Sequence, residues 1–262
     1  MHERMTIITT AGRPDELSDE LAQKAHRALG FPIVPRNKRS VQRLQKEYGK
    51  DVLVAGKERY ELFRIGMEKP FFFHPNSAAF RLKRVQQGET DPLIEASGLK
   101  IGDHFLDCTL GLASDSIIAA NHIGKSGRCM GLEADATVAF LTQVGLQTFA
   151  TDSSMLSEAM AAIEVMHMEA VEFLKTQKTA SWDVVYIDPM FSSPIEESSN
   201  FSALRQAGVH KTLTEEWVRE ALRVCKRSVV VKERYDSVVF DQFAFKRTIR
   251  PSSKIHFGTI TK

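Results

Sequence analysis

The sequence is poor in cysteine and has no long apolar run. Its three cysteines, Cys108, Cys129 and Cys225, are far apart and form no CxxC pair, which argues against a disulfide framework or a zinc cluster. No apolar stretch approaches the roughly 20 residues that span a bilayer. Residues 1–10 have neither the basic start nor the apolar core of a signal peptide. We therefore expect a cytoplasmic protein that binds no metal and does not enter a membrane.

Charge is distributed unevenly along the chain, although the net charge is only +2. Residues 36–84 carry 13 Lys and Arg against 5 Asp and Glu, and residues 223–262 carry 10 against 3. Residues 85–222 carry 8 Lys and Arg against 20 Asp and Glu. Two basic segments around an acidic centre are typical of a protein that holds a polyanion beside an acidic pocket. Solvated charged faces would give the same composition, so both interpretations stay open on charge alone.

Residues 1–88 predict a small, basic α+β extension that could contact RNA. Apolar periodicity and turn residues indicate strands at 5–10, 52–55 and 60–65 and helices at 15–29 and 40–48. Asn76 or Ser77 is predicted to cap a further helix, which carries Arg81, Lys83 and Arg84.

Residues 89–262 predict a second, larger unit. Predicted strands at 104–108, 128–133, 163–167, 182–187, 228–232 and 254–260 alternate with predicted helices at 91–99, 115–122, 136–148, 170–175 and 215–222. This alternation predicts a doubly wound, mostly parallel sheet. Ligands of such sheets lie at the carboxyl ends of the strands.

Residues 107–115 join an apolar strand to a helix through a turn that contains Gly111. A glycine lets the backbone approach a ligand closely. The three-glycine pattern of a dinucleotide-binding turn is absent, because Ala113 and Ser116 stand where the later glycines are required. Asp107 and Asp115 favour a cationic ligand, and the sulfonium and α-amino groups of S-adenosylmethionine meet that requirement. A tight turn without a ligand is the alternative.

Two further acidic residues follow predicted strands. Glu133 lies 22 positions after Gly111 and could accept both hydroxyls of a ribose, which NAD and S-adenosylmethionine share. Glu169 could accept the amino group of adenine, with Met168 packed on the ring. Glu133 in isolation would more often be a plain surface carboxylate, and the signal from Glu169 is weak alone.

The segment Asp188-Pro189-Met190-Phe191 follows an apolar strand and is the most specific motif. Proline fixes the turn and lacks an N–H, so the adjacent carbonyl can face a pocket. That carbonyl and Asp188 could accept hydrogen bonds from an exocyclic amine while Phe191 stacks on the base. Two acceptors favour charge build-up on the amine nitrogen in the transition state. We therefore predict Asp188, Pro189 and Phe191 as the catalytic residues.

Lys232 ends the apolar run Val229-Val230-Val231 on the same predicted rim. It could hold a phosphate or the substrate base. A lysine whose charged end extends from the strand into solvent is the alternative.

In this order, residues 107–115, 186–191 and 229–232 resemble the RsmJ-like family of methyltransferases, with the resemblance covering roughly residues 71–262. It implies the class I methyltransferase fold, a Rossmann-like, doubly wound, mostly parallel seven-stranded sheet with a small N-terminal α+β extension. It also implies transfer of a methyl group from S-adenosyl-L-methionine to guanine N2 in small-subunit 16S ribosomal RNA. The implied cofactor contacts are Ser114, Asp115, Glu133, Ala134, Glu169, Ala170 and Asp188, to which the turn adds Asp107, Thr109 and Gly111.

The sequence departs from the family pattern in two places. A glycine and an arginine of the family are replaced by Ala113 and Ser114, and a Gly-rich basic stretch becomes residues 74–87. Arg81, Lys83, Arg84 and Lys232 are the predicted substrate contacts, with RNA as the partner. An Asp-Pro-x-Phe motif serves any exocyclic amine, so an adenine-N6 or cytosine-N4 nucleic-acid methyltransferase is the alternative. A non-catalytic nucleic-acid-binding module of the same fold is a third interpretation.

Overall fold

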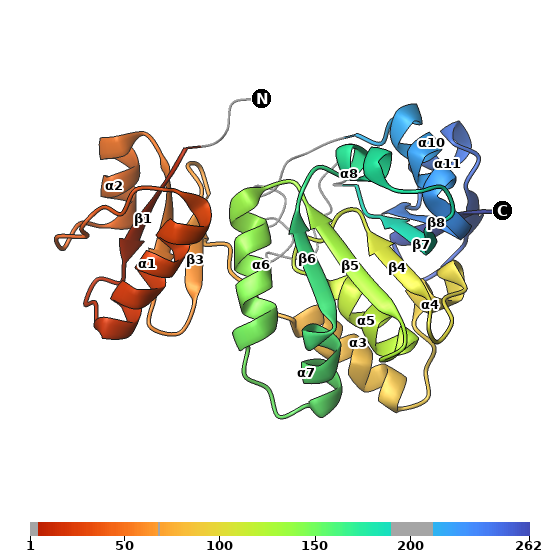
Figure 1. Cartoon of the computed structure of the whole chain (residues 1–262), viewed down its shortest axis with the longest axis horizontal. Helices are drawn as coiled ribbons and strands as arrows, with labels where there is room; N and C mark the ends of the chain where they lie inside the picture. The colour runs from red at the N-terminus through yellow and green to blue at the C-terminus, as the bar shows by residue number, and fades with distance from the viewer. Residues whose placement is uncertain (1–4, 68, 190–211) are drawn as a thin grey trace.

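The computed structural model describes residues 5–67, 69–189 and 212–262, which form a small N-terminal unit beside a larger α/β unit (Figure 1). The N-terminal unit consists of β1 (Thr6–Thr10), α1 (Glu16–Leu29), α2 (Val41–Tyr48), β2 (Asp51–Ala55) and β3 (Tyr60–Phe63). Its strand order is β1-β2-β3, with β1 parallel and β3 antiparallel to β2. The predicted strands and helices of this region are confirmed.

Helices cover both faces of the small sheet. Ile8 and Leu53 pack with side chains of α1, whereas Ile7 and Val52 pack with side chains of α2. A strand that is buried on both faces reads as a continuous apolar run instead of an alternating one, as β2 does. The small unit therefore has the architecture of a miniature α/β sheet.

The larger unit contains seven strands and the helices that cover them. Its elements are α3 (Asn76–Gln86), α4 (Pro92–Ser97), β4 (His104–Asp107), α5 (Ser114–Ile123), β5 (Arg128–Glu133), α6 (Ala136–Thr148), α7 (Ser154–Ala161), β6 (Ile163–His167), α8 (Ala170–Thr176), β7 (Trp182–Ile187), α10 (Glu215–Val224), β8 (Cys225–Arg234), α11 (Val239–Gln242), β9 (Lys246–Thr248) and β10 (Ile255–Thr261). The strand order is β6-β5-β4-β7-β8-β10-β9. Among the described strands of this sheet, β10 pairs antiparallel with both β8 and β9 and every other pair is parallel, so the predicted doubly wound, mostly parallel sheet is confirmed.

Successive residues of the central strands face opposite layers of helices. Phe105 belongs to the core formed with α3, α5, α6 and α7, and Leu106 belongs to the core formed with α8, α10 and α11. The chain adds β5 and β6 on one side of β4, then returns to add β7 and β8 on the other side. Sheets with such a reversal bind their ligands in a crevice outside the carboxyl ends of the strands that flank it, which here are β4 and β7.

Three short elements were not predicted, namely α7, α11 and β9. The prediction that Asn76 or Ser77 caps α3 is wrong, because Pro75 stands at the N-cap and no side chain caps the helix. Helix α3 packs against α5 and α7, so it lies on the larger sheet although it precedes residue 88 (Figure 1). Within the described residues, no helix has the length and apolarity that crossing a membrane requires.

A buried arginine joins the two units. Arg64, which follows β3, is 2% exposed. Its guanidinium donates to Asp51 of β2 at 2.9 Å and forms an ion pair with Asp135, the N-cap residue of α6. The Asp135 carboxylate also accepts the backbone N–H groups of Thr137 and Val138, at 2.9 and 3.1 Å. The N-terminal unit is thereby fixed to the start of α6.

This arrangement predicts a large loss of stability for Arg64→Met. The substitution should lower the free energy of unfolding by about 3–5 kcal/mol, because it leaves two carboxylates buried without their cation. Arg84→Met is the matched control, since Arg84 pairs with Glu89 where both side chains are nearly half exposed. The control should cost far less, because solvent screens an exposed ion pair. Urea unfolding measures both values, and equal losses would contradict the assignment of Arg64.

Candidate active site

Four predicted site residues stand at the carboxyl edge of the large sheet. Asp107 and Glu133 are the last residues of β4 and β5, Asp188 follows β7, and Lys232 lies near the end of β8. Because these strands are parallel, their carboxyl ends meet at the crevice between β4 and β7. The topology therefore gathers residues from four separate parts of the sequence.

Asp107 organises the turn after β4. Its buried carboxylate accepts the backbone N–H of Thr109 at 2.9 Å and the hydroxyl of Ser116 at 2.6 Å. Burial raises the pKa of Asp107 to about 7. The hydroxyl of Thr109 in turn accepts the backbone N–H of Asp188 at 2.7 Å. One turn thus sets the relative positions of the ends of β4 and β7.

The turn ends in a strained residue. Ala113, at the N-cap of α5, has φ +60° and is fully buried. An L-residue other than glycine costs roughly 1–2 kcal/mol in this left-handed region. Such strain is concentrated at functional sites, where the surrounding contacts enforce it. A glycine would adopt this conformation without that cost, and Ser114 follows as the first, partly exposed residue of α5.

Glu133 has the chemistry of a ribose acceptor. One carboxylate oxygen accepts the backbone N–H of Gly111 at 3.1 Å, and the other accepts that of Asp135 at 2.9 Å. A carboxylate has about four acceptor positions, so about two remain for ligand hydroxyls. Glu133 and Ala134 are partly exposed. Burial nevertheless raises the pKa of Glu133 to about 7.

The end of β6 adjoins Glu133. The backbone N–H of Met168 donates to the carbonyl of Glu133 at 3.0 Å. The Glu169 carboxylate caps α8 by accepting the backbone N–H of Glu172 at 3.1 Å, and Ala170 is buried at the start of that helix. Residues predicted to contact ribose and adenine therefore lie side by side.

Asp115 is the centre of a buried network of charges. Its carboxylate accepts Arg81 Nη1 at 2.6 Å, Lys232 Nζ at 2.8 Å and the Tyr186 hydroxyl at 2.8 Å. The same Lys232 ammonium donates to Asp188 Oδ2 at 2.8 Å. Arg81 also binds both carboxylate oxygens of Asp91, at 2.7 and 2.8 Å. The network therefore joins α3, α5, β7 and β8 to the N-cap of α4.

The charges within this network are strongly coupled. Burial opposes the ionisation of Asp115, but Lys232 and Arg81 outweigh it and hold the pKa of Asp115 below its usual value. Burial also opposes the charge of Lys232, yet Asp115 and Asp188 hold the pKa of its ammonium above its usual value. For Asp188, burial prevails over Lys232 and raises the pKa. Asp115 is thus compensated inside the protein and offers a ligand less charge than the sequence suggested.

The predicted substrate contacts have different environments. Arg81 and Lys232 belong to the buried network, Arg84 pairs with Glu89, and Lys83 is exposed.

Of the other predicted catalytic residues, Pro189 is buried, whereas Phe191 lies outside the described residues. Among the described residues, no group of three or more His, Cys, Asp and Glu could hold a metal ion.

Tyr186 and Asp91 were not predicted as parts of the site. A signal for Tyr186 exists, because it precedes Asp188 by two positions and residues two apart on a strand share one face. No local pattern marks Asp91, whose carboxylate meets Arg81 through the packing of α3 against the larger unit.

The fold and the acidic strand ends together define a class I methyltransferase. The chain belongs to a family of S-adenosylmethionine-dependent methyltransferases, because residues 38–249 match the family model described as "Putative SAM-dependent methyltransferase". A relative from Bacillus subtilis (strain 168), the "Uncharacterized protein YpiP", is 42% identical over 254 residues, which cover 97% of this chain and 98% of the relative.

A solved structure has the same fold. The SAM-dependent methyltransferase NGO1261 from Neisseria gonorrhoeae aligns with a TM-score of 0.57 at 19% sequence identity, covering 97% of this chain and 95% of the other. Membership of the methyltransferase family, and not this likeness of fold, makes S-adenosyl-L-methionine the cofactor. The residues present fit it, since the partly exposed Glu133 carboxylate has unused acceptor positions for the ribose hydroxyls.

The raised pKa of Glu133 predicts that cofactor affinity depends on pH. Glu133 is protonated below about pH 7 in the folded protein, and an ionised carboxylate accepts stronger hydrogen bonds than a neutral one. Affinity for S-adenosylhomocysteine should therefore rise as pH increases through that value. Glu133→Gln should weaken binding by about ten- to a hundredfold and remove most of this rise.

Calorimetric titration at about one pH unit on either side of the Glu133 pKa measures both effects. The amine of S-adenosylhomocysteine titrates equally with every variant. Its contribution to the pH dependence of affinity therefore cancels when a variant is compared with the wild type. Glu164→Gln, on the exposed face of β6, is the control and should behave as the wild type. A Glu133→Gln protein that keeps the wild-type affinity and pH dependence would exclude Glu133 from the cofactor site.

Proposed function

We propose that this methyltransferase modifies an exocyclic amine of an RNA base, with guanine N2 of small-subunit ribosomal RNA as the target. The observation that carries the proposal is the position of Asp188. It follows β7 at the crevice, its backbone is fixed by Thr109, and one carboxylate oxygen is held by Lys232. Within the described residues, the other oxygen, Oδ1, has no partner and is available to a substrate N–H.

The residues of the crevice have distinct roles in this proposal. S-adenosylmethionine, when bound, supplies an electrophilic methyl group on sulfur. Asp188 and the carbonyl next to Pro189 accept hydrogen bonds from the two N–H groups of the amine, which directs the nitrogen lone pair outward and stabilises the developing positive charge. Glu133 and Glu169 orient the nucleoside part of the cofactor. Positioning of amine and methyl group for in-line attack supplies much of the rate.

Lys232 positions Asp188 in this proposal and does not itself contact the base. Its ammonium lies 2.8 Å from both Asp115 and Asp188, so two of its three N–H donors are already used by the protein. A carboxylate held at one oxygen keeps its orientation and its charge. Arg81 supports the arrangement from α3 by fixing Asp115 at 2.6 Å.

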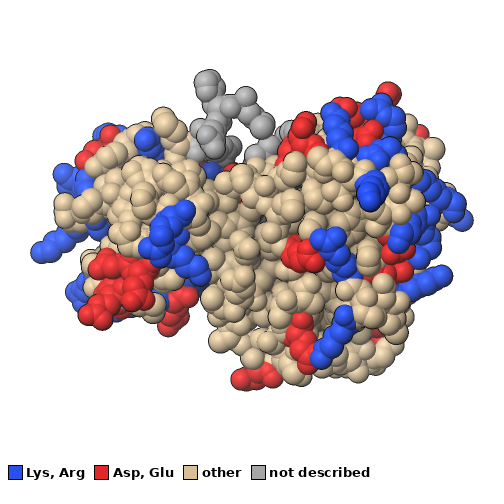
Figure 2. Space-filling view, in the orientation of Figure 1, with Lys and Arg blue, Asp and Glu red and all other residues tan. Residues whose placement is uncertain are grey.

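An RNA substrate is supported by charge and by the resemblance to the RsmJ-like family. The basic segments 36–84 and 223–262 provide many cations for phosphate contacts. Figure 2 shows that Lys and Arg on one face are spread over both units and interleaved with Asp and Glu. The contacts with RNA are therefore expected to be separate sites and not one continuous basic track on this face.

Transfer of a tritiated methyl group from S-adenosylmethionine to hypomethylated ribosomal RNA tests the proposal. We expect labelled RNA whose nucleoside digest contains N2-methylguanosine by mass spectrometry. Methylated adenine or cytosine would support the adenine-N6 or cytosine-N4 alternative instead. Label that appears in a metabolite and never in RNA would refute an RNA substrate.

Asp188→Asn should lower kcat about a hundred- to a thousandfold, because the substitution removes a charged acceptor from the developing cation. Affinity for S-adenosylhomocysteine should change much less. Asp183→Asn is the matched control, since Asp183 lies on the same strand and pairs with Lys226 at the opposite end. Equal rates for Asp188→Asn and Asp183→Asn would remove Asp188 from catalysis, whereas no methyl transfer by the wild type to any nucleic acid would favour a non-catalytic binding module.

Lys232→Met should shift the acidic limb of the pH–rate profile to higher pH. Burial raises the pKa of Asp188 and Lys232 opposes that rise, so loss of the cation allows the pKa to increase further. Asp188 is then protonated, and inactive as a charged acceptor, up to a higher pH. Lys226→Met, on the same strand, should leave the profile unchanged. If the acidic limb of the pH–rate profile, measured on the residual activity of Lys232→Met, does not shift, then Lys232 does not act through Asp188.

A further inference from the structure

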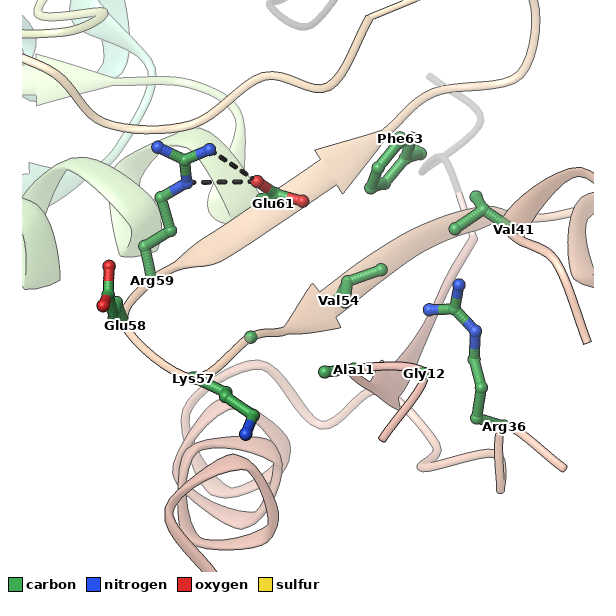
Figure 3. A pocket seen from close by; sticks show the side chains of 11 residues that line it. Ala11, Gly12, Arg36, Val41, Val54, Lys57, Glu58, Arg59, Glu61 and Phe63 are labelled. Carbon is green, nitrogen blue, oxygen red and sulfur yellow. Dashed lines mark hydrogen bonds and ion pairs between the residues drawn. The ribbon is translucent and has the colours of Figure 1, made fainter. Parts of the chain in front are cut away.

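The N-terminal unit contains an open cavity of about 550 Å³. Its floor is formed by Ala11 and Gly12, which follow β1, and by Gly56, which follows β2. Figure 3 shows these two strand ends side by side below the cavity, with Phe63 on the far wall. Because β1 and β2 are parallel, the cavity occupies the place where α/β sheets bind their ligands.

Arg36 brings a positive charge into this cavity. Its Nε donates to the carbonyl of Arg39 at 2.7 Å and its Nη1 to that of Thr10 at 3.2 Å, so both contacts are to uncharged groups. Within the described residues, Arg36 has no carboxylate partner and its Nη2 has no acceptor. Burial lowers the pKa of Arg36, because nothing nearby compensates the charge. An anion in the cavity would supply that compensation.

The other cations of the cavity wall are already paired. Lys57 lies 3.3 Å from Asp15, and Arg59 lies 2.7 Å from Glu61. Figure 3 shows the Arg59–Glu61 pair on one side of the cavity and the Arg36 guanidinium on the other, between Gly12 and Val41. Glu58 is exposed at the rim, where solvent and salt screen its charge. Arg36 is thus the cation of this wall that lacks an acidic partner.

The wall beside Arg36 is apolar. Val41 and Val54 are buried, and the ring of Phe63 is partly exposed. An arginine and an aromatic ring in the same cavity suit a nucleotide, whose phosphate takes the charge while its base packs on the ring. A free carboxylate or sulfate would leave the apolar wall unused.

We propose that this cavity binds a phosphate group of the RNA substrate through Arg36, with the adjoining base against Phe63. The choice of RNA rests on the proposed function, while the preference for phosphate rests on the cavity itself. The cavity lies at the end of β2 opposite to Asp51, whose partner Arg64 contacts the start of α6. The five residues of β2 separate these two ends of the strand by about 17 Å. A phosphate bound by Arg36 would therefore lie far from the contact with α6 and remote from Asp188 in the larger unit.

A remote phosphate contact has a specific kinetic consequence. Loss of Arg36 should weaken RNA binding and raise KM for a long ribosomal RNA fragment, while kcat stays unchanged. A very short RNA that occupies only the catalytic crevice should be methylated equally well by the wild type and by Arg36→Gln. Such a dependence on RNA length would not result from general loss of structure.

Direct binding provides the test, with fluorescence anisotropy of a labelled ribosomal RNA fragment and the full-length protein. Arg36→Gln should bind about tenfold more weakly and should lower the slope of log K against log salt by about one. Arg36→Lys should recover much of the affinity. Arg43→Gln, an exposed arginine of α2 outside the cavity, is the matched control and should change affinity less than twofold.

The outcomes separate this inference from the proposed function. RNA binding that needs Arg36, without methyl transfer to RNA, supports the cavity and refutes the proposed function. Methyl transfer to RNA with equal losses for Arg36→Gln and Arg43→Gln supports the function and overturns the cavity. Adenosine monophosphate that binds in an Arg36-dependent way, while RNA binding does not depend on Arg36, overturns RNA as the ligand. Melting temperature and S-adenosylhomocysteine binding verify that each variant is folded.

Discussion

The buried contact between Asp115 and Lys232 is the interaction on which the rest of the active-site edge depends. If its two carboxylate partners were removed, the buried charge of Lys232 would be left uncompensated. If Lys232 and Arg81 were removed, the buried charge of Asp115 would be left uncompensated in the same way. Removal of one partner from such a pair typically costs several kcal/mol, because the other charge is left in a medium of low polarity. The network therefore fixes where β7 and β8 end relative to α5. It also positions Asp188, the most exposed of the charged side chains in the network, at the carboxyl end of β7.

A second chain of contacts connects the N-terminal unit to the cofactor site. Arg64 binds Asp135, the backbone N–H of Asp135 donates to Glu133, and Glu133 accepts the N–H of Gly111. The loop that would hold the ribose is therefore held from the N-terminal unit as well as from the turn after β4. This explains why a small unit with its own sheet and its own cavity stays in a fixed relation to the catalytic crevice. Under the proposed function, RNA bound at the small unit would approach the crevice from a defined direction.

The sequence predicted the positions of the strand-end acids well, for a topological reason. Parallel strands with alternating helices place Asp107, Glu133 and Asp188 at one edge whatever the details of packing. It could not predict that Asp115 is compensated, since its partners Arg81, Tyr186 and Lys232 lie 34, 71 and 117 positions away. Such pairings arise from tertiary packing and leave no local pattern.

The same limit applies to Arg81. A basic run suggested contact with phosphate, but the packing of α3 brings its guanidinium onto Asp91 and Asp115. The short elements α7, α11 and β9 were missed because four to eight residues, or three in β9, carry too little periodicity.

A crystal structure of the protein with S-adenosylhomocysteine tests the central claim most directly. We expect the Glu133 carboxylate to accept hydrogen bonds from both ribose hydroxyls, while Lys232 stays between Asp115 and Asp188 and Asp188 Oδ1 faces the sulfur. A nucleoside bound away from Glu133, or a Lys232 side chain that leaves Asp115 to contact the ligand, would contradict the roles assigned to this edge of the sheet.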